Sequence, residues 1–303
     1  MKELFKRLLS RFGLYVSKGY TVYLFNNKKI VKRKVFGREL VMPRDHSIIE
    51  NLARFPHYNS NLPRLVSQYQ QYRKEKFAIL DIGANIGDTL IMLREVTDLP
   101  VHCFEGDPFY FRLLEQNSSG IADSYLHQVL LSDKPSSLKV RNNIQLGTSS
   151  FTGDAEGGTL MEFSSVDHFF EEHHPDVPIG VIKTDTDGFD LRIIRGAAAT
   201  IRRYRPVLFL EYDRTLFEKN GDDGRQFLDF LAGLDYNGLI VYDNFGKLLS
   251  VTTLKDNMSV RALHSYIRKQ ILGAPFYDLA VFPASGQAFF ESFAASELAF
   301  FEQ

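Results

Sequence analysis

Residues 78–90, with the sequence AILDIGANIGDTL, restrict the possible folds of this chain more than any other segment. The apolar run 77–82 is typical of a short strand that is buried on both faces. Gly83 and Gly87 follow it, and glycines suit tight turns and close approach of the backbone to a ligand. Apolar residues at helical spacing then predict a helix over 86–96. The segment therefore predicts a nucleoside-binding loop at the end of a buried strand.

The glycine spacing of this loop argues against a dinucleotide. A dinucleotide fingerprint reads G-x-G-x-x-G, and its second glycine lets the backbone approach the pyrophosphate. Here the position two after Gly83 is Asn85. The flanking carboxylates of Asp81 and Asp88 would repel a phosphate and attract a cationic or hydroxyl-bearing ligand.

From residue 77 onward strands and helices alternate, which predicts a mainly parallel sheet with helices on both faces. Strands are expected at 77–82, 100–105, 125–131, 179–185, 206–212, 238–242 and 276–282, and further helices at 108–116, 189–204 and 225–234. Residues 132–158 are rich in Ser, Gly, Asn and Asp. They are expected to form loops and short strands on the ligand side, and they are a candidate lid.

Residues 1–76 are expected to form an α+β extension that precedes a domain of residues 77–303. Its predicted elements are a basic helix over 1–16, a hairpin between 20–25 and 29–40, and helices from 47 to 72. Asp45 is the candidate cap of the first of these later helices.

Charge is distributed unevenly along the chain. Residues 1–40 contain eleven Lys or Arg against two Glu, a net +9, whereas the whole chain has a net charge of -1. An amphipathic basic helix over 1–16 can lie on an anionic membrane surface. The alternative, which base rates favour, is that its apolar stripe docks on the protein's own core. Nucleic acid is disfavoured as a partner, because no basic patch with interleaved aromatic residues follows.

Cysteine content and hydropathy indicate the compartment. Cys103 is the only cysteine, so the chain has neither a disulfide framework nor a cysteine-based zinc site. No run approaches the roughly 18 apolar residues of a membrane span, and the first residues lack a signal-peptide pattern. We therefore expect a cytoplasmic protein, with peripheral membrane contact through residues 1–16 as the alternative.

Polar residues follow several of the predicted strands, where open parallel sheets bind their ligands. Glu105 ends the second strand, 24 residues after Asp81, which is about the position of an acid that binds ribose hydroxyls. Ser132 and Asp133 follow the third strand. They either meet the amino edge of an adenine or simply begin a turn.

The segment 183–190, KTDTDGFD, gathers one cation and three carboxylates at the end of the fourth strand. Buried charges need partners, and Glu211 at the end of the fifth strand would lie about one strand spacing from Asp185. Such a pair can create a general base. It can instead bind a divalent cation, although no other feature of the sequence supports a metal. In a purely structural network, Lys183 would neutralise Asp185 and Asp187 would cap the next helix.

At these residues the chain resembles the FkbM family of S-adenosylmethionine-dependent methyltransferases. The matching blocks keep their order and spacing over residues 77–212, and they are LDIGANIGD at 80–88, FEGDP at 104–108, LSD at 131–133, SVD at 165–167, IKTDTDG at 182–188, IRG at 194–196, and RP at 205–206 with Glu211. The resemblance implies a class I methyltransferase (Rossmann-like) fold, with a seven-stranded sheet that has one antiparallel strand. The chain departs from the family at Gly106, where proline is common, and at Asp187, where glutamate is common.

The resemblance also implies roles for individual residues. The methionine part of S-adenosylmethionine is expected to contact Asp81, Gly83, Asn85 and Gly87. Its ribose is expected to contact Glu105, and its adenine Ser132 and Asp133. The substrate is expected to face Lys183, Asp185, Asp187 and Glu211. We predict an O-methyltransferase in which Asp185 or Asp187 deprotonates or orients an acceptor hydroxyl on a sugar, glycan or secondary metabolite.

Residues 42–59 also look like an extension seen in family members linked to polysaccharide biosynthesis. Two other functions remain open at this point. One is a nucleotide-sugar or NAD-dependent oxidoreductase, and the other is a non-catalytic binding module on the same fold.

Overall fold

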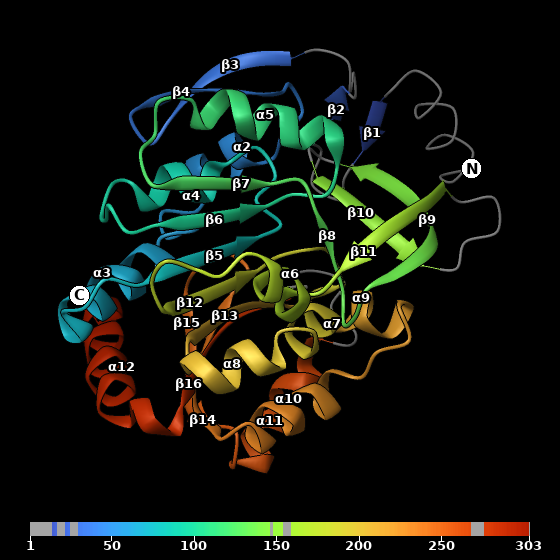
Figure 1. Ribbon diagram of the computed structural model, residues 1–303. Coiled ribbons are helices and arrows are strands. Elements are labelled where there is room, and N and C mark those ends of the chain that lie inside the picture. Colours follow the sequence, from blue (N-terminus) through green and yellow to red (C-terminus); the bar gives the residue numbers. More distant parts are fainter. Residues whose placement is uncertain are drawn as a thin grey trace.

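The computed structural model describes residues 14–16, 22–24, 30–145, 148–153, 159–267 and 276–302 (Figure 1). At its centre is an eight-stranded sheet with the order β15-β14-β16-β13-β12-β5-β6-β7. The strands are β5 (Ala78–Ile82), β6 (Val101–Phe104), β7 (Ser124–His127), β12 (Ile179–Thr184), β13 (Val207–Tyr212), β14 (Tyr236–Asp243), β15 (Leu248–Thr253) and β16 (Tyr277–Pro283). The expected mainly parallel sheet is confirmed, because β7, β6, β5, β12 and β13 pair in parallel.

The sheet has one strand more than expected. β16 lies antiparallel between β13 and β14, and β15 pairs antiparallel with β14 at the sheet edge. The sequence of β15, LLSVTT, has no fully buried residue in this structure. An edge strand of this kind lacks the continuous apolar run that marks strands buried on both faces, which explains why the sequence did not predict it.

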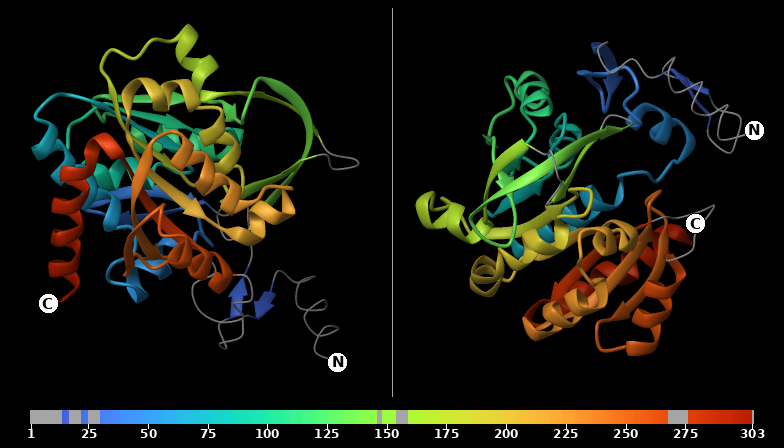
Figure 2. Two further views of the ribbon diagram at one scale, coloured as in Figure 1. Left: turned by 90° about the horizontal axis from the view of Figure 1, so that it is seen from below. Right: turned by 90° about the vertical axis from the view of Figure 1, so that its right-hand side faces the viewer.

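Helices cover both faces of the sheet (Figure 2). One face packs against α2 (Ile48–Arg54), α3 (Asn61–Arg73), α4 (Asp88–Leu93), α5 (Pro108–Ser118) and α12 (Gln287–Phe301). The other packs against α6 (Val166–Glu172), α7 (Asp190–Arg195), α8 (Ala198–Tyr204), α9 (Arg214–Lys219), α10 (Gly224–Gly233) and α11 (Asn257–Tyr266). A short 3-10 helix, η2 (Ala284–Gly286), precedes α12.

A second, four-stranded sheet lies beside the carboxyl ends of the parallel strands (Figure 1). It consists of β8 (Leu130–Leu131), β9 (Ser136–Gln145), β10 (Thr148–Gly153) and β11 (Thr159–Ser164) in the order β10-β9-β11-β8. The expectation of loops and short strands over 132–158 was wrong in its main part, because β9 alone is ten residues long. β9 and β10 form a hairpin. Backbone hydrogen bonds between the two strands stabilise it, so it can form from a polar sequence.

The extension forms two hairpins, and neither is the expected one. β1 (Leu14–Val16) pairs with β2 (Val22–Leu24), and β3 (Ile30–Val35) pairs with β4 (Arg38–Pro43). The latter turns at Phe36 and Gly37, which have φ values of 46° and 71°. Two positive φ values are typical of a tight hairpin turn, and this turn divides the run 29–40, for which the sequence predicts a single strand. The predicted helix over 1–16 is wrong at residues 14–16, which form strand β1. The rest of this prediction lies outside the described residues.

The two helices expected between residues 47 and 72 are confirmed as α2 and α3, but Asp45 does not cap α2. The N-cap is Ser47, without a side-chain bond, and His46 Nδ1 accepts a hydrogen bond from the Ile48 amide at 3.3 Å. The imidazole therefore occupies the role predicted for the Asp45 carboxylate.

Residues 30–73 share their hydrophobic core with the central sheet, since Leu40 and Leu65 belong to the same buried cluster as β5 and α12. An ion pair fixes this contact: Arg64 Nε and Nη2 each lie 2.7 Å from a carboxylate oxygen of Glu297 on α12. Tyr242 donates a further bond to Glu297 at 2.8 Å. Among the helices of the described residues, none is long and apolar enough to cross a membrane.

Candidate active site

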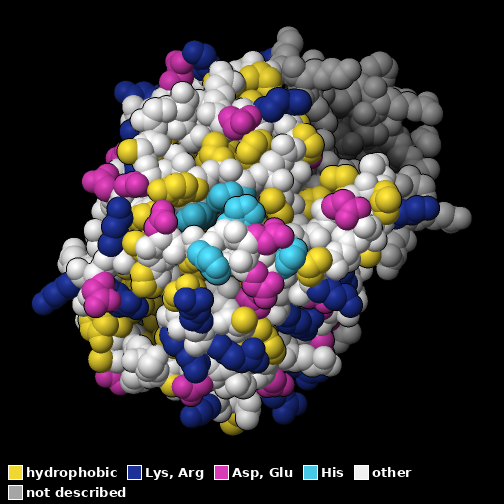
Figure 3. Space-filling model, in the orientation of Figure 1, with side chains coloured by type: hydrophobic (Ala, Val, Ile, Leu, Met, Phe, Trp, Pro, Cys, Tyr) yellow, Lys and Arg dark blue, Asp and Glu magenta, His cyan; other side chains and the backbone are white. Residues whose placement is uncertain are grey.

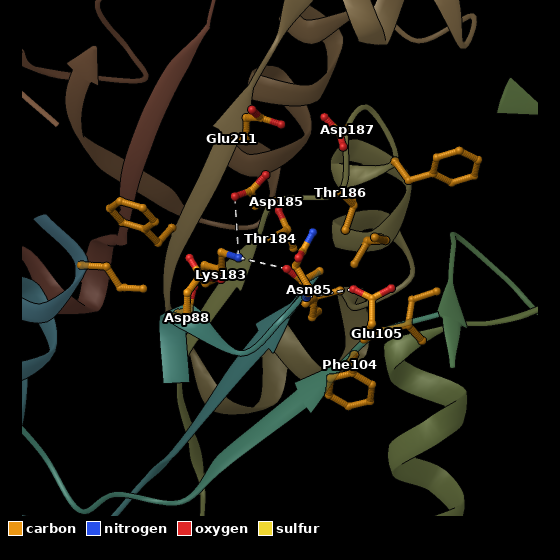
Figure 4. Close-up of a pocket in the computed structure, with 18 of the residues that line it drawn as sticks. Asn85, Asp88, Phe104, Glu105, Lys183, Thr184, Asp185, Thr186, Asp187 and Glu211 are labelled. Atoms are coloured by element: carbon orange, nitrogen blue, oxygen red, sulfur yellow. Dashed lines mark hydrogen bonds and ion pairs between the residues drawn. The ribbon is translucent and has the colours of Figure 1, made fainter. Parts of the chain in front are cut away.

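A cavity of about 170 Å³ opens at the carboxyl ends of the parallel strands, where open α/β sheets bind their ligands. Figure 4 shows the residues that line it. Charged and amide side chains come from the ends of β5, β6, β12 and β13 and from the start of β16, and they include Asn85, Asp88, Glu105, Lys183, Asp185, Asp187, Glu211 and Asp278. Its apolar wall includes Ile82, Phe104, Leu131, Phe163 and Phe189.

The glycine loop follows β5 and turns sharply below this cavity. Gly83, Asn85 and Gly87 have positive φ values of 82°, 48° and 86°. A methyl group at Gly83 would overlap the backbone carbonyl of Asp185, so the close contact between the ends of β5 and β12 requires glycine. Gly87 is the N-cap of α4 and does not line the cavity.

Glu105 follows β6 and is tied to the glycine loop. One of its carboxylate oxygens accepts a hydrogen bond from the Asn85 amide at 2.8 Å, and the other accepts one from the Asp107 amide at 2.8 Å. Burial raises the pKa of Glu105 to about 7. The structure thus places the predicted ribose-binding acid at the cavity and fixes its orientation.

Lys183 and Asp81 are register partners on β12 and β5. Their Nζ and Oδ1 atoms lie 3.0 Å apart, and the Asp81 side chain is fully buried. Lys183 Nζ is also 3.7 Å from Asp185 Oδ2, and Figure 4 marks this ion pair with a dashed line. Although burial opposes it, the charge of Asp81 raises the pKa of Lys183 above its ordinary value. Asp81 does not line the cavity, so it acts on the site through Lys183.

The turn after β12 is held by Asp190 and not by Asp187. The Asp190 carboxylate accepts bonds from the amides of Thr186 at 3.0 Å and Gly188 at 3.2 Å. The alternative in which Asp187 caps the next helix is wrong, because the N-cap of α7 is Phe189 and no side chain caps this helix. Asp187 has a φ of 51°, and Figure 4 shows its side chain on the same side of the strand ends as Glu211.

Burial governs the ionisation of these acids. It raises the pKa of Asp187 to about 7, with a further contribution from Asp185. Burial also raises the pKa of Glu211 well above its ordinary value, and Asp185 and Asp187 add to this effect. Glu211 Oε2 has no hydrogen-bond partner among the described residues. The end of the cavity at β12 and β13 therefore holds one carboxyl group, that of Asp187, which can exchange a proton near neutral pH.

Ser132 and Asp133 lie outside the described lining of the cavity. The Ser132 hydroxyl is buried and donates to Asp133 Oδ1 at 3.2 Å, while Asp133 itself is exposed. The residues just before them, Val129 to Leu131, contribute to the wall instead. The adenine role of this pair stays a prediction.

Several lining residues escaped the sequence analysis: His46, Tyr58 and Asn61 of the extension and Asp278 of β16. His46 Nε2 lies 3.3 Å from Asn85 Oδ1, and Asn61 donates to Asp278 Oδ2 at 3.4 Å. Burial lowers the pKa of His46 and raises that of Asp278 to about 7. The one signal in the sequence was Asp278, an acid near the start of the predicted strand 276–282. It indicates a site residue only when that strand is known to be antiparallel, because the start of an antiparallel strand lies at the same sheet edge as the carboxyl ends of the parallel strands.

Histidines gather on one face of the molecule, outside this cavity (Figure 3). His102 Nδ1 and His127 Nε2 lie 3.1 Å apart on neighbouring strands, and the His102 ring stacks on Tyr125. Burial lowers the pKa of His127 to about 4, which keeps it neutral. These contacts indicate packing. No group of three or more His, Cys, Asp or Glu in the described parts of the chain is arranged to hold a metal ion.

Two features define a class I S-adenosylmethionine-dependent methyltransferase fold. One is the strand order, in which antiparallel β16 lies between β13 and β14. The other is the glycine loop after β5, whose Asn85 amide binds the strand-end acid Glu105. The model of the methyltransferase FkbM domain matches residues 81–237. Because this match spans more than half of the chain, the protein belongs to the FkbM family of methyltransferases.

Solved structures that match this chain include other methyltransferases. The FkbM methyltransferase of Methylobacillus flagellatus KT is 17% identical, with 54% of this chain and 40% of that chain covered and a TM-score of 0.36. A putative O-methyltransferase from Klebsiella pneumoniae is 13% identical, with 78% and 88% covered and a TM-score of 0.43. The chain thus spans less than half of the Methylobacillus protein. The comparison with curated proteins gives no match.

Proposed function

We propose that this methyltransferase transfers the methyl group of S-adenosylmethionine to a hydroxyl oxygen of a sugar, glycan or secondary metabolite. The similarity of residues 42–59 to members linked to polysaccharide biosynthesis favours a glycan acceptor handled in the cytoplasm. The observation that carries the hydroxyl assignment is the partly buried carboxyl of Asp187, whose pKa is raised by desolvation to about 7, on the same side of the strand ends as Glu211.

The residues of the cavity fit S-adenosylmethionine. This molecule has an ammonium and a sulfonium group and no phosphate, which suits a cavity lined by several carboxylates and a loop without pyrophosphate spacing. Gly83 and Asn85 would hold its methionine part, and Glu105 would hold its ribose. An apolar wall that contains Phe104, Leu131 and Phe163 offers a surface for a flat base.

When bound, the cofactor supplies an electrophilic methyl group. The protein must then align the acceptor oxygen and take up its proton. Asp185 and Asp187 follow β12, and a carboxyl with a pKa near neutrality is suited to accept a proton. Lys183, 3.7 Å from Asp185, restrains that side chain. We assign Asp185 to orienting the hydroxyl and Asp187 to proton uptake.

The test is an Asp185→Asn variant assayed with radiolabelled S-adenosylmethionine and a panel of glycans and sugars. We expect transfer to fall about 100-fold or more, while S-adenosylhomocysteine affinity in calorimetry stays within about threefold. Asp229→Asn, an exposed charge change on α10, is the matched control. Full activity of Asp185→Asn would overturn this role. Cofactor binding without transfer to any acceptor would support the non-catalytic alternative.

A further inference from the structure

The end of the cavity farthest from Glu105 is formed by β13, β16 and the extension. The strand order β16-β13-β12-β5-β6 puts Glu105 and Asp278 four strand spacings apart, about 19 Å along the sheet edge. If the ribose lies at Glu105, the β13–β16 end is left for the acceptor. The residues there are Tyr58, Asn61, Glu211 and Asp278.

Glu211 and Asp278 are direct register partners on antiparallel β13 and β16. Residues directly opposite each other in such a pair share one face of the sheet, and like charges at these positions destabilise it. Glu211 is 8% exposed, and its Oε2 atom has no hydrogen-bond partner among the described residues. Asp278 accepts one long bond, from Asn61 at 3.4 Å. One buried and one partly buried acid thus line the cavity, and Asn61 is their only side-chain hydrogen-bond donor among the described residues.

The protein itself supplies little compensating charge at this end. Lys183 is the only Lys or Arg among the described residues that line the cavity. It is already engaged by Asp81 at 3.0 Å and Asp185 at 3.7 Å. Buried carboxylates that lack a partner are costly, so a cation delivered by the ligand would relieve an unfavourable arrangement. The described acids do not form a metal-holding group.

We infer that the β13–β16 end binds a protonated amine, so that the acceptor is an amino sugar or a similar amine-bearing polyol. An ammonium group has three donors and no acceptor, which matches the carboxylates of Glu211 and Asp278 and the hydroxyl oxygen of Tyr58. A phosphate or carboxylate would be repelled, and a neutral hydroxyl would provide no positive charge to hold the two acids in their ionised form. This inference rests on the proposed function and narrows its acceptor class.

The experiment compares sugars that differ in one substituent. Calorimetry on the full chain saturated with S-adenosylhomocysteine would measure binding of a set of aminodeoxyglucoses, each with a different hydroxyl replaced by an amine, against glucose and glucuronate. We expect at least one amine to bind about tenfold more tightly than glucose, and glucuronate to bind more weakly than glucose. Asp278→Asn should bring the amine to the level of glucose, whereas the exposed Asp229→Asn should retain the preference.

Two results would overturn the inference: glucose binding as tightly as every amine, or an amine preference that survives in Asp278→Asn. Glu211→Gln is the second variant if Asp278→Asn does not fold, with S-adenosylhomocysteine binding as the check on folding. Failure of the unmodified protein to bind S-adenosylhomocysteine would instead contradict the proposed function, so the two failures are distinguishable.

Discussion

Lys183 and Asp81 form a buried ion pair between neighbouring strands, with 3.0 Å between Nζ and Oδ1. The Asp81 side chain is completely buried, and the Lys183 side chain is 8% exposed. The pair links the strand before the glycine loop to the strand before the candidate catalytic acids. It therefore connects the proposed cofactor end of the site to the proposed acceptor end.

Replacing Lys183 with Met should destabilise the fold by about 3–5 kcal/mol, because Asp81 is left buried without a counter-charge. Urea denaturation measures this change. The control is Lys76→Met, since Lys76 and Asp123 form an exposed pair at 3.8 Å, and this variant should cost at most about 1 kcal/mol. Adding Asp81→Asn to Lys183→Met should recover part of the loss. Equal effects of the two lysine variants would contradict the structural role of the buried pair.

Gly83→Ala should impair both folding and cofactor binding. Gly83 and Gly120 have similar positive φ values of 82° and 77°, but only at Gly83 would a methyl group overlap another backbone segment. Gly120→Ala therefore isolates the left-handed strain, which costs about 1–2 kcal/mol. We expect Gly83→Ala to cost clearly more in urea denaturation and to weaken S-adenosylhomocysteine binding. A loss no larger than that of Gly120→Ala would show that the β5–β12 contact tolerates a side chain.

The rate of methyl transfer should rise with pH through about 7 and then level off. Burial first and Asp185 second raise the pKa of Asp187 to about 7, and a base accepts a proton only when it is ionised. The pH profile of kcat/KM measures this limb once an acceptor is in hand. Asp187→Asn should lower the plateau and remove the limb. A profile of Asp187→Asn that keeps the same midpoint would assign the titration to another group.

The contact between the extension and α12 should be needed for stability. Arg64 pairs with Glu297, whose side chain is completely buried, so Arg64→Met should cost about 3–5 kcal/mol in urea denaturation. Arg54→Met removes the partly exposed pair of Arg54 with Glu50 and should cost at most about 1 kcal/mol. If Arg64→Met behaved like Arg54→Met, the Arg64–Glu297 pair would contribute no more to stability than an exposed pair.

Strands that are buried on both faces were predictable because their apolar character is local. The runs at 77–82 and 179–185 correspond closely to β5 and β12. Strands that depend on pairing rather than on burial were not predictable. β15 and β9 are examples, because none of their described side chains is fully buried. The turn at Phe36 and Gly37 was also missed, because Phe is an uncommon residue at a positive φ.

The sequence alone determined the half of the site that lies at the ends of neighbouring parallel strands. Glu105, Lys183 and Glu211 each follow or end a buried strand, and parallel strands present their carboxyl ends at one edge. The tertiary structure alone decided the remainder. Asn61 and Asp278 are 217 positions apart in the chain, and they meet because α3 packs over the sheet and antiparallel β16 begins at that edge. Long-range packing leaves no local pattern, so the β13–β16 end of the cavity could be recognised only once the chain was folded.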